Sequence, residues 1–216
     1  MGKDSAVLEV MPDFGKLQDS FRSHWISLKF YESKPEGFKV RRNTHFCEAI
    51  GLALTEPVLI KLSDIPCAGG KYVFQNDLKA KSKLAADFCG KKGFSKQSVE
   101  NILQKICRLP KNYAYAGFNT DECKPDFAIS FMSPEEMTSF ITVYNAKTGK
   151  KLSCELTGFM SVCGECAAKS MAHNTVTVSF GSEDARKYSE LSERAVVCVP
   201  FKMIKLFIRG EKSHSH

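Results

Sequence analysis

The chain has 216 residues, of which 43% are hydrophobic, and this length and composition suit one large domain or two small ones. Its formal net charge is +7, but the basic residues form no stripe interleaved with aromatic residues, so no nucleic-acid partner is expected. No apolar run reaches the roughly 18 residues needed to cross a membrane. The first residues also lack a signal-peptide pattern, so we expect a cytoplasmic protein without a membrane partner.

Nine cysteines are the most distinctive feature of this composition. An odd number of scattered cysteines does not fit a complete disulfide framework. Thiols that stay reduced inside a cell bind soft metals or take part in redox reactions more often than they form disulfides. We therefore look for chemistry first among the cysteines.

The first half of the chain alternates apolar patterns of helical and strand period. Met11, Phe14, Leu17 and Phe21 recur at helical spacing, and an alternating, β-rich segment follows them. These patterns, with their caps and breakers, predict helices over 11–23, 44–54, 78–88 and 95–107, strands over 25–31 and 57–62, and a tight loop over 66–70.

The second half has clearer signals for where its helices begin and end. Ser133 is a helix cap, Pro134 suits the first helical position, and the two following glutamates face the positive end of the helix dipole. Gly149 is expected to end that helix. Strands are predicted over 113–118, 127–131, 152–157, 175–180 and 195–199, and helices over 134–146, through Cys163 and Cys166 to 174, over 182–188 and over 201–209.

This alternation predicts an α/β or mixed α+β fold in a single compact domain. We expect a helical extension over 1–24, the domain over 25–210 and a disordered tail over 211–216. Cys47 and Cys166 are each followed by an alanine at the same spacing, then by a strand and a loop that ends in a basic residue and tyrosine. This internal similarity suggests a degenerate two-fold repeat, which would bring Cys47 and Cys166 to equivalent places.

Cys163-Gly164-Glu165-Cys166 is the strongest local motif. Two thiols three residues apart at a helix start can chelate one metal or form a redox pair, and the helix dipole favours their thiolates. The alternative is that both are small buried residues on a helix. A zinc ribbon would need a second Cys-x-x-Cys, and the chain has none.

Cys67 and Cys47 are the other candidate ligands. Cys67 precedes two glycines, whose backbone can approach a cofactor closely and expose amides to it, although a plain turn is an equal alternative. Cys47 opens an apolar helix and could instead face the core. The remaining cysteines are assigned to packing, namely Cys89, Cys107, Cys123, Cys154 and Cys198.

A second kind of candidate site would bind an anion. Backbone amides at Gly69, Gly70 and Gly181, together with Arg42 or Arg186, are the groups that hold a phosphate or a carboxylate. The acidic pair that follows Gly181 argues against a strong anion site there. The sequence contains no catalytic triad order, phosphate loop, dinucleotide fingerprint or zinc-protease motif.

Several short motifs resemble an uncharacterised prokaryotic family catalogued as domain of unknown function 169. They are Phe46-Cys47-Glu48-Ala49, Ile65-Pro66-Cys67-Ala68-Gly69-Gly70, Gly164-Glu165-Cys166, Val178-Ser179-Phe180-Gly181 with Arg186, and Val197-Cys198-Val199-Pro200. The resemblance covers the chain from about Trp25 to its end. It implies a cytoplasmic protein of a kind frequent in anaerobes, without a settled activity, with family cysteines at Cys47, Cys67 and one of Cys163 or Cys166.

These observations lead to three functional hypotheses. The first is an iron–sulfur cluster held by Cys67, Cys163 and Cys166 with Cys47 as the fourth ligand, in an electron-transfer or accessory redox role with a redox partner protein. The second is a protein that binds a small anionic metabolite. The third is a thiol-dependent enzyme whose nucleophile is Cys67 or Cys163. The sequence specifies neither a substrate nor an oligomeric state.

Overall fold

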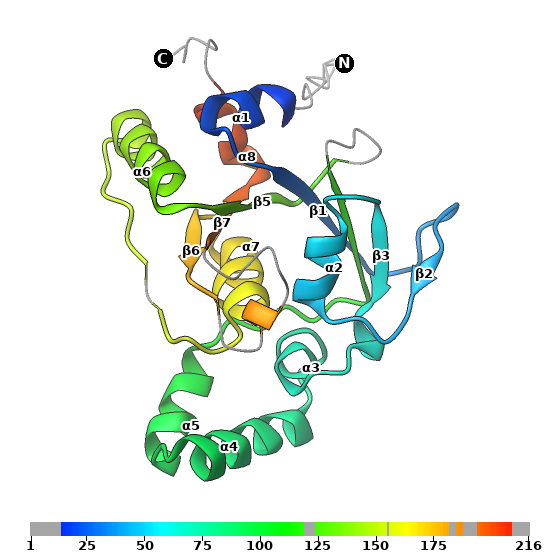
Figure 1. The fold of residues 1–216 in the computed structure, drawn as a ribbon. Helices are drawn as coiled ribbons and strands as arrows, with labels where there is room; N and C mark the ends of the chain where they lie inside the picture. The colour runs from blue at the N-terminus through cyan, green and yellow to red at the C-terminus, as the bar shows by residue number, and fades with distance from the viewer. Residues whose placement is uncertain (1–13, 119–123, 155, 182–184, 188–193, 209–216) are drawn as a thin grey trace, which may run out of the picture.

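Segments rich in β-branched and aromatic residues pair into a seven-stranded mixed sheet in the computed structural model of the chain. Figure 1 shows the sheet with the helices around it. The structure describes residues 14–118, 124–154, 156–181, 185–187 and 194–208. The strands are β1 (Trp25–Tyr31), β2 (Val40–Arg41), β3 (Val58–Lys61), β4 (Tyr113–Phe118), β5 (Phe127–Met132), β6 (Thr177–Ser179) and β7 (Ala195–Pro200). Their order is β2-β3-β4-β1-β5-β7-β6, and only β2 and β3 run parallel among neighbours.

Helices connect and cover these strands. The α-helices are α1 (Phe14–Phe21), α2 (Phe46–Leu52), α3 (Ala68–Gln75), α4 (Leu78–Lys92), α5 (Lys96–Lys105), α6 (Pro134–Thr148), α7 (Lys169–His173) and α8 (Phe201–Ile204). The shorter or wider turns are η1 (Leu62–Asp64), the π-helix η2 (Ser161–Ala168), η3 (Ala185–Lys187) and η5 (Lys205–Phe207). The described elements form a single compact mixed α+β domain, as the sequence predicted.

The sheet consists of two halves that meet where β1 pairs with β5. In the first half β4 lies between β1 and β3, which therefore run parallel to each other. In the second half β7 lies in the same way between β5 and β6. This symmetry of strand order is compatible with the expected two-fold repeat, which remains a prediction.

Apolar side chains alternate along the strands and build one core on each face of the sheet. Ile26, Leu28 and Phe30 of β1 face a core shared with α2, α3, α5 and η2. Trp25 and Val197 face a second core shared with α1, α6 and α8. The first core carries the cysteines, because α2, α3 and η2 all pack on that face of the sheet.

Local signals set where several helices begin and end. The Ser133 hydroxyl accepts a hydrogen bond from the Glu136 amide, and the Glu136 carboxylate accepts one from the Ser133 amide, so a complete capping box starts α6. Gly149 ends α6 at a φ of 67°, in the left-handed region where glycine is unstrained. The Ser95 hydroxyl caps α5 by accepting a hydrogen bond from the Ser98 amide. The sequence predicted these three positions correctly.

Three expected elements differ in the structure. The described residues of 152–157 form no strand: Cys154 and Leu156 are exposed, so the apolar alternation there has no sheet to join. The expected loop over 66–70 is instead the start of helix α3. Of the expected helix over 182–188, only η3 lies within the described residues.

The ends of the chain also bear on the expected organisation. α1 packs its Phe14, Leu17 and Phe21 side chains into the second core, against the sheet. The expected tail over 211–216 and the expected packing position of Cys123 lie outside the described residues. In the described part of the chain, no helix has the length and apolar character needed to cross a membrane.

Candidate thiol site

Three cysteines that are far apart in sequence lie together where three helices begin. Cys47 is the second residue of α2, Cys67 is the cap residue of α3, and Cys163 lies in the first turn of η2. All three are half-buried and border the first core. The helices that carry them pack on the same face of the sheet, which brings the three thiols to one place.

The pKa values of Cys47 and Cys163 are raised by burial and by their cysteine neighbours. Burial, and after it the nearby Cys67 thiol, raises the pKa of Cys47 from 9.0 to about 12. Burial also raises the pKa of Cys163 well above its ordinary value, and Cys67 and then Cys47 add to that shift. Since charge interactions weaken with distance, the effects of Cys67 on both other thiols and of Cys47 on Cys163 indicate that the three sulfurs lie near one another.

Backbone amides are directed at the sulfur atoms. The Gly70 amide donates a hydrogen bond to Cys67 Sγ at 3.3 Å, as a helix cap requires. Backbone hydrogen bonds from the first turns of α2 and η2 likewise lower the pKa of Cys47 and Cys163, in opposition to burial. Each thiol therefore sits in an apolar setting with donors that favour its anion.

Glycines allow α3 and η2 to pack closely around this cluster. A Cβ on Gly70 would lie 2.6 Å from Ile65 Cγ2 and 3.1 Å from Cys67 Sγ. A Cβ on Gly69 would lie 2.8 Å from Met160 Cγ, at the residue that precedes η2. The two glycines predicted as anion ligands thus have a packing role. A side chain at Gly69 would push α3 away from the start of η2, and one at Gly70 would meet the Ile65 and Cys67 side chains.

The π-helical form of η2 decides which cysteine joins the cluster. A π-helix bonds residue i to i+5 and has more residues per turn than an α-helix, so side chains three positions apart diverge more. Cys166 Sγ donates to the Val196 carbonyl at 3.6 Å, and Cys166 raises the pKa of buried Cys198 beside it. The expected convergence of Cys166 with Cys163 is therefore absent, because Cys166 faces β7.

A buried carboxylate holds η2 in place. Glu165 accepts hydrogen bonds from the hydroxyl and amide of Thr157, from the Gly158 amide at 3.0 Å and from the Ser179 hydroxyl at 2.7 Å. A buried carboxylate is tolerated only when donors of this kind satisfy it. Glu165 therefore ties the loop before η2 and the end of β6 to the helix that carries Cys163.

The spacing of the thiols does not match a site for a single metal ion. Within the described ranges, no three histidine, cysteine, aspartate or glutamate side chains are arranged to hold one ion. The cluster consists of sulfur donors alone, with apolar neighbours from the first core. Sulfur donors of this kind suit soft metals and iron–sulfur clusters.

The remaining predicted anion ligands lie at different parts of the sheet. Arg42 is exposed and follows β2, the strand at one edge. Arg186 follows β6, the strand at the other edge, and donates to the Phe180 carbonyl. A Cβ on Gly181 would lie 3.5 Å from Arg186 Cγ, so this predicted pair is together, while Arg42 is not part of it.

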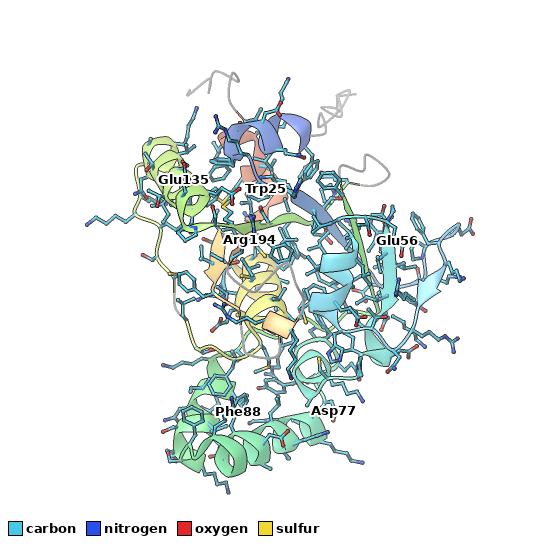
Figure 2. All side chains as sticks on the ribbon, viewed as in Figure 1. Trp25, Glu56, Asp77, Phe88, Glu135 and Arg194 are labelled. Atoms are coloured by element: carbon cyan, nitrogen blue, oxygen red, sulfur yellow. The ribbon has the colours of Figure 1, made fainter. Side chains whose placement is uncertain are left out.

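Arg186 lines a cavity that sequence reasoning did not anticipate. The cavity measures about 310 Å³ and also contains the side chain of Arg194, which lies between α6 and the sheet (Figure 2). Arg194 donates to Glu136 Oε2 at 3.1 Å and to the Phe131 carbonyl at 3.2 Å. The other lining residues are Met132, Pro134, Met137, Phe180 and Ala195.

One further pair was missed by the sequence. Cys107, assigned to packing, has its Sγ 3.5 Å from Nε2 of His173. The two residues are 66 positions apart, and neither sits in a motif that would link them. The tertiary contact of Ile106, which follows α5, with Gly164 of η2 brings the two residues together.

The described residues form a single mixed α+β domain in which three thiols gather on one face of the sheet. The chain belongs to the family catalogued as domain of unknown function 169 and described as uncharacterised ArCR, whose model matches residues 20–210. No curated protein and no solved structure is significantly similar to it. The family resemblance read from the sequence is thus confirmed.

Proposed function

We propose that the protein binds an iron–sulfur cluster through Cys47, Cys67 and Cys163, in an electron-transfer or accessory redox role. The observation that carries this proposal is the gathering of three thiols, from three helix starts, into one buried group. Cys166 is left out of the ligand set because its sulfur faces the Val196 carbonyl.

The charge balance of the site supports a cationic occupant. Three neighbouring thiols that are shielded from water resist ionisation, as the raised pKa values of Cys47 and Cys163 indicate. A metal centre reverses this situation, because metal-bound thiols are deprotonated and their charges are neutralised. The amide donors around the sulfurs also favour the thiolate form that a metal requires.

A cluster fits the site better than a single ion. Structural zinc needs four donors in a tight tetrahedron, and the described residues provide no such group. A cluster contains several metal atoms and separates its protein ligands further than one ion does. When bound, it would supply a reversible electron-transfer couple, and the hydrogen bond from Gly70 to Cys67 Sγ would help to set its potential.

The raised pKa of Cys163 argues against the hypothesis that this residue is the nucleophile of a thiol-dependent enzyme. A cysteine nucleophile acts as a thiolate and needs a lowered pKa. The pKa of Cys163 is raised by burial and by its two cysteine neighbours. A nucleophilic role for Cys163 would therefore work against its surroundings.

Purification without oxygen, followed by iron and sulfide analysis and visible spectroscopy, tests the proposal. We expect iron and acid-labile sulfide in similar amounts, with a broad visible absorption that dithionite bleaches. Cys47→Ser, Cys67→Ser and Cys163→Ser should each lose most of the iron. Cys166→Ser is the matched control, since it lies on the same helix as Cys163, and it should retain the cluster.

Two results would overturn this proposal. One is protein that stays free of iron and sulfide after anaerobic purification and chemical reconstitution. The other is equal loss of iron in Cys163→Ser and Cys166→Ser while Cys154→Ser, at an exposed position, retains it. Circular dichroism of each variant separates loss of ligation from loss of folding.

The cavity between α6 and the sheet supports a second function, the binding of a small anionic metabolite. Two guanidinium groups, from Arg186 and Arg194, meet an apolar lining of methionine, proline and phenylalanine side chains. Glu136 balances one of the two positive charges through its ion pair with Arg194. A small carboxylate with an apolar body matches this combination of charge and surface.

Thermal shift measurements with a panel of small carboxylates and phosphates test this second function. A ligand should raise the unfolding temperature of the natural protein, and Arg186→Ala should abolish the rise. Arg42→Ala is the control, because Arg42 is equally exposed but follows the strand at the other sheet edge. If no compound shifts the transition, or if both variants lose the shift equally, the cavity is not the binding site.

A further inference from the structure

Cys107 and His173 form a thiol–imidazole pair outside the proposed cluster. Cys107 follows Ile106, the residue that ends α5, and His173 is the last residue of α7. Their Sγ and Nε2 atoms are 3.5 Å apart. Cys107 is half-buried and His173 is exposed, so small reagents can reach the pair from solvent.

Close packing of the two chain segments fixes this distance. A Cβ on Gly164 would lie 2.8 Å from Ile106 Cγ2, so the residue before Cys107 rests directly on η2. Helix α7 continues from η2 without a break and carries His173 to the same place. The pair is thus held by α7, which continues from η2, and by the segment that follows α5 and rests on η2 through Ile106.

The contact between the two side chains suits proton transfer. An imidazole nitrogen within reach of a thiol can accept its proton and so generate the nucleophilic thiolate. The Cys107 thiol therefore has a base beside it without help from a metal.

We propose that His173 serves as the base for the Cys107 thiol, and that Cys107 undergoes thiol–disulfide exchange with small disulfides once its proton has passed to His173 Nε2. The Cys107 thiolate attacks one sulfur of the disulfide, forming a new S–S bond to that half of the molecule. The original S–S bond breaks, and its electron pair leaves with the other sulfur, which takes the Nε2 proton of His173. One protein thiol and one disulfide thus give one mixed disulfide and one small thiol.

The Cys107–His173 pair does not include any of the three cysteines proposed to bind the iron–sulfur cluster. Burial and mutual repulsion keep the thiols of Cys47 and Cys163 protonated at neutral pH in the metal-free protein. Cys107 differs because its neighbour is an imidazole and not another thiol. The exchange reaction therefore needs no metal, and it holds whether or not a cluster binds.

Exchange with 2-hydroxyethyl disulfide, a neutral reagent, provides the test on the reduced full-length protein. Peptide mass spectrometry at short times should locate the first mixed disulfide at Cys107, at least about tenfold ahead of exposed Cys154. His173→Gln should reduce the Cys107 rate to that of Cys154. His45→Gln should leave it unchanged, because His45 caps a different helix.

A second variant keeps the test decisive if His173→Gln affects folding. In Cys107→Ser the fast phase should disappear while the slower modification of Cys154 continues. The proposal is wrong if Cys107 reacts no faster than Cys154, if His173→Gln keeps the full rate, or if the fast phase survives in Cys107→Ser. Circular dichroism of each variant confirms that the fold is intact.

Discussion

Cys163 and Cys166 stand three residues apart on one helix, yet their sulfurs have different neighbours. The pKa of Cys163 is raised by Cys67 and Cys47. The Cys166 thiol instead donates a hydrogen bond to the Val196 carbonyl and lies beside Cys198. The π-helical geometry of η2 separates the two directions. A Cys-x-x-Cys motif in this setting contributes one thiol to the group formed with Cys47 and Cys67, and one side chain to the core.

Alkaline pH should destabilise the metal-free protein through Cys47. Its pKa is raised from 9.0 to about 12 in the folded state, so the unfolded chain loses this proton first. The stabilisation is therefore complete below pH 9 and is lost as the pH rises toward 12. Urea unfolding between these limits should show the free energy of unfolding falling by about 1.4 kcal/mol per pH unit for this thiol.

Cys47→Ala isolates that contribution. The variant should show a shallower decline of stability with pH than the natural protein, by about the slope of one titrating group. Cys154→Ser, at an exposed position, should keep the natural slope. Identical slopes for Cys47→Ala and the natural protein would contradict the raised pKa.

Replacement of Gly70 by alanine should destabilise the protein by about 1–3 kcal/mol, because the new Cβ meets Ile65 Cγ2 and forces the surroundings to shift. Gly90 is the control, since it lies inside α4 with no neighbouring atom within 4 Å of an added Cβ. Gly90→Ala should stabilise by about 0.5–1 kcal/mol through helix propensity. Urea unfolding measures both, and equal effects would refute the packing role of Gly70.

The Glu165 carboxylate should be sensitive to loss of its charge. Glu165→Gln turns an amide donor toward groups that already donate, namely Thr157, Gly158 and Ser179, and should cost about 1–3 kcal/mol. Glu135→Gln, in the exposed first turn of α6, should cost less than about 1 kcal/mol. Thermal unfolding distinguishes these outcomes, and a Glu165→Gln variant as stable as Glu135→Gln would argue against the buried anchor.

Two buried serines in neighbouring strands should respond differently to alanine. The Ser27 hydroxyl donates to the Gly117 carbonyl at 2.9 Å, so Ser27→Ala should cost about 0.5–1.5 kcal/mol. Among the described residues, the Ser130 hydroxyl is buried without a hydrogen-bond partner. Ser130→Ala should therefore be neutral or stabilising in chemical denaturation, and a loss as large as that of Ser27→Ala would reveal an unseen partner.

Sequence patterns predicted the fold best where local chemistry dominates. The strand Trp25–Tyr31 and the helix from Pro134 to its stop at Gly149 follow the expected positions closely. Their signals are local, namely alternation of apolar residues and a capping box. The expected strand over 152–157 failed because a strand also needs a partner, and the segment with exposed Cys154 has none to pair with.

The candidate site was predictable in its residues but not in its geometry. Cys47, Cys67 and Cys163 were all chosen from their sequence context, whereas the divergence of Cys166 depends on a π-helix that no sequence pattern marks. Gly69 and Gly70 were predicted to belong to an anion-binding loop. In a sequence, glycines that permit close packing cannot be told from glycines that expose amides to an anion. The pairing of Cys107 with His173 depends on tertiary contacts alone.

Two of the three thiols, those of Cys47 and Cys67, come from the first third of the chain, and that of Cys163 comes from the last third. Any centre that ligates them all would act as a cross-link, closing long loops of backbone and reducing the freedom of the unfolded polypeptide. Removal of the centre would then loosen the whole domain and not only its redox site. The resistance of the protein to proteolysis would therefore depend on the supply of iron and sulfide.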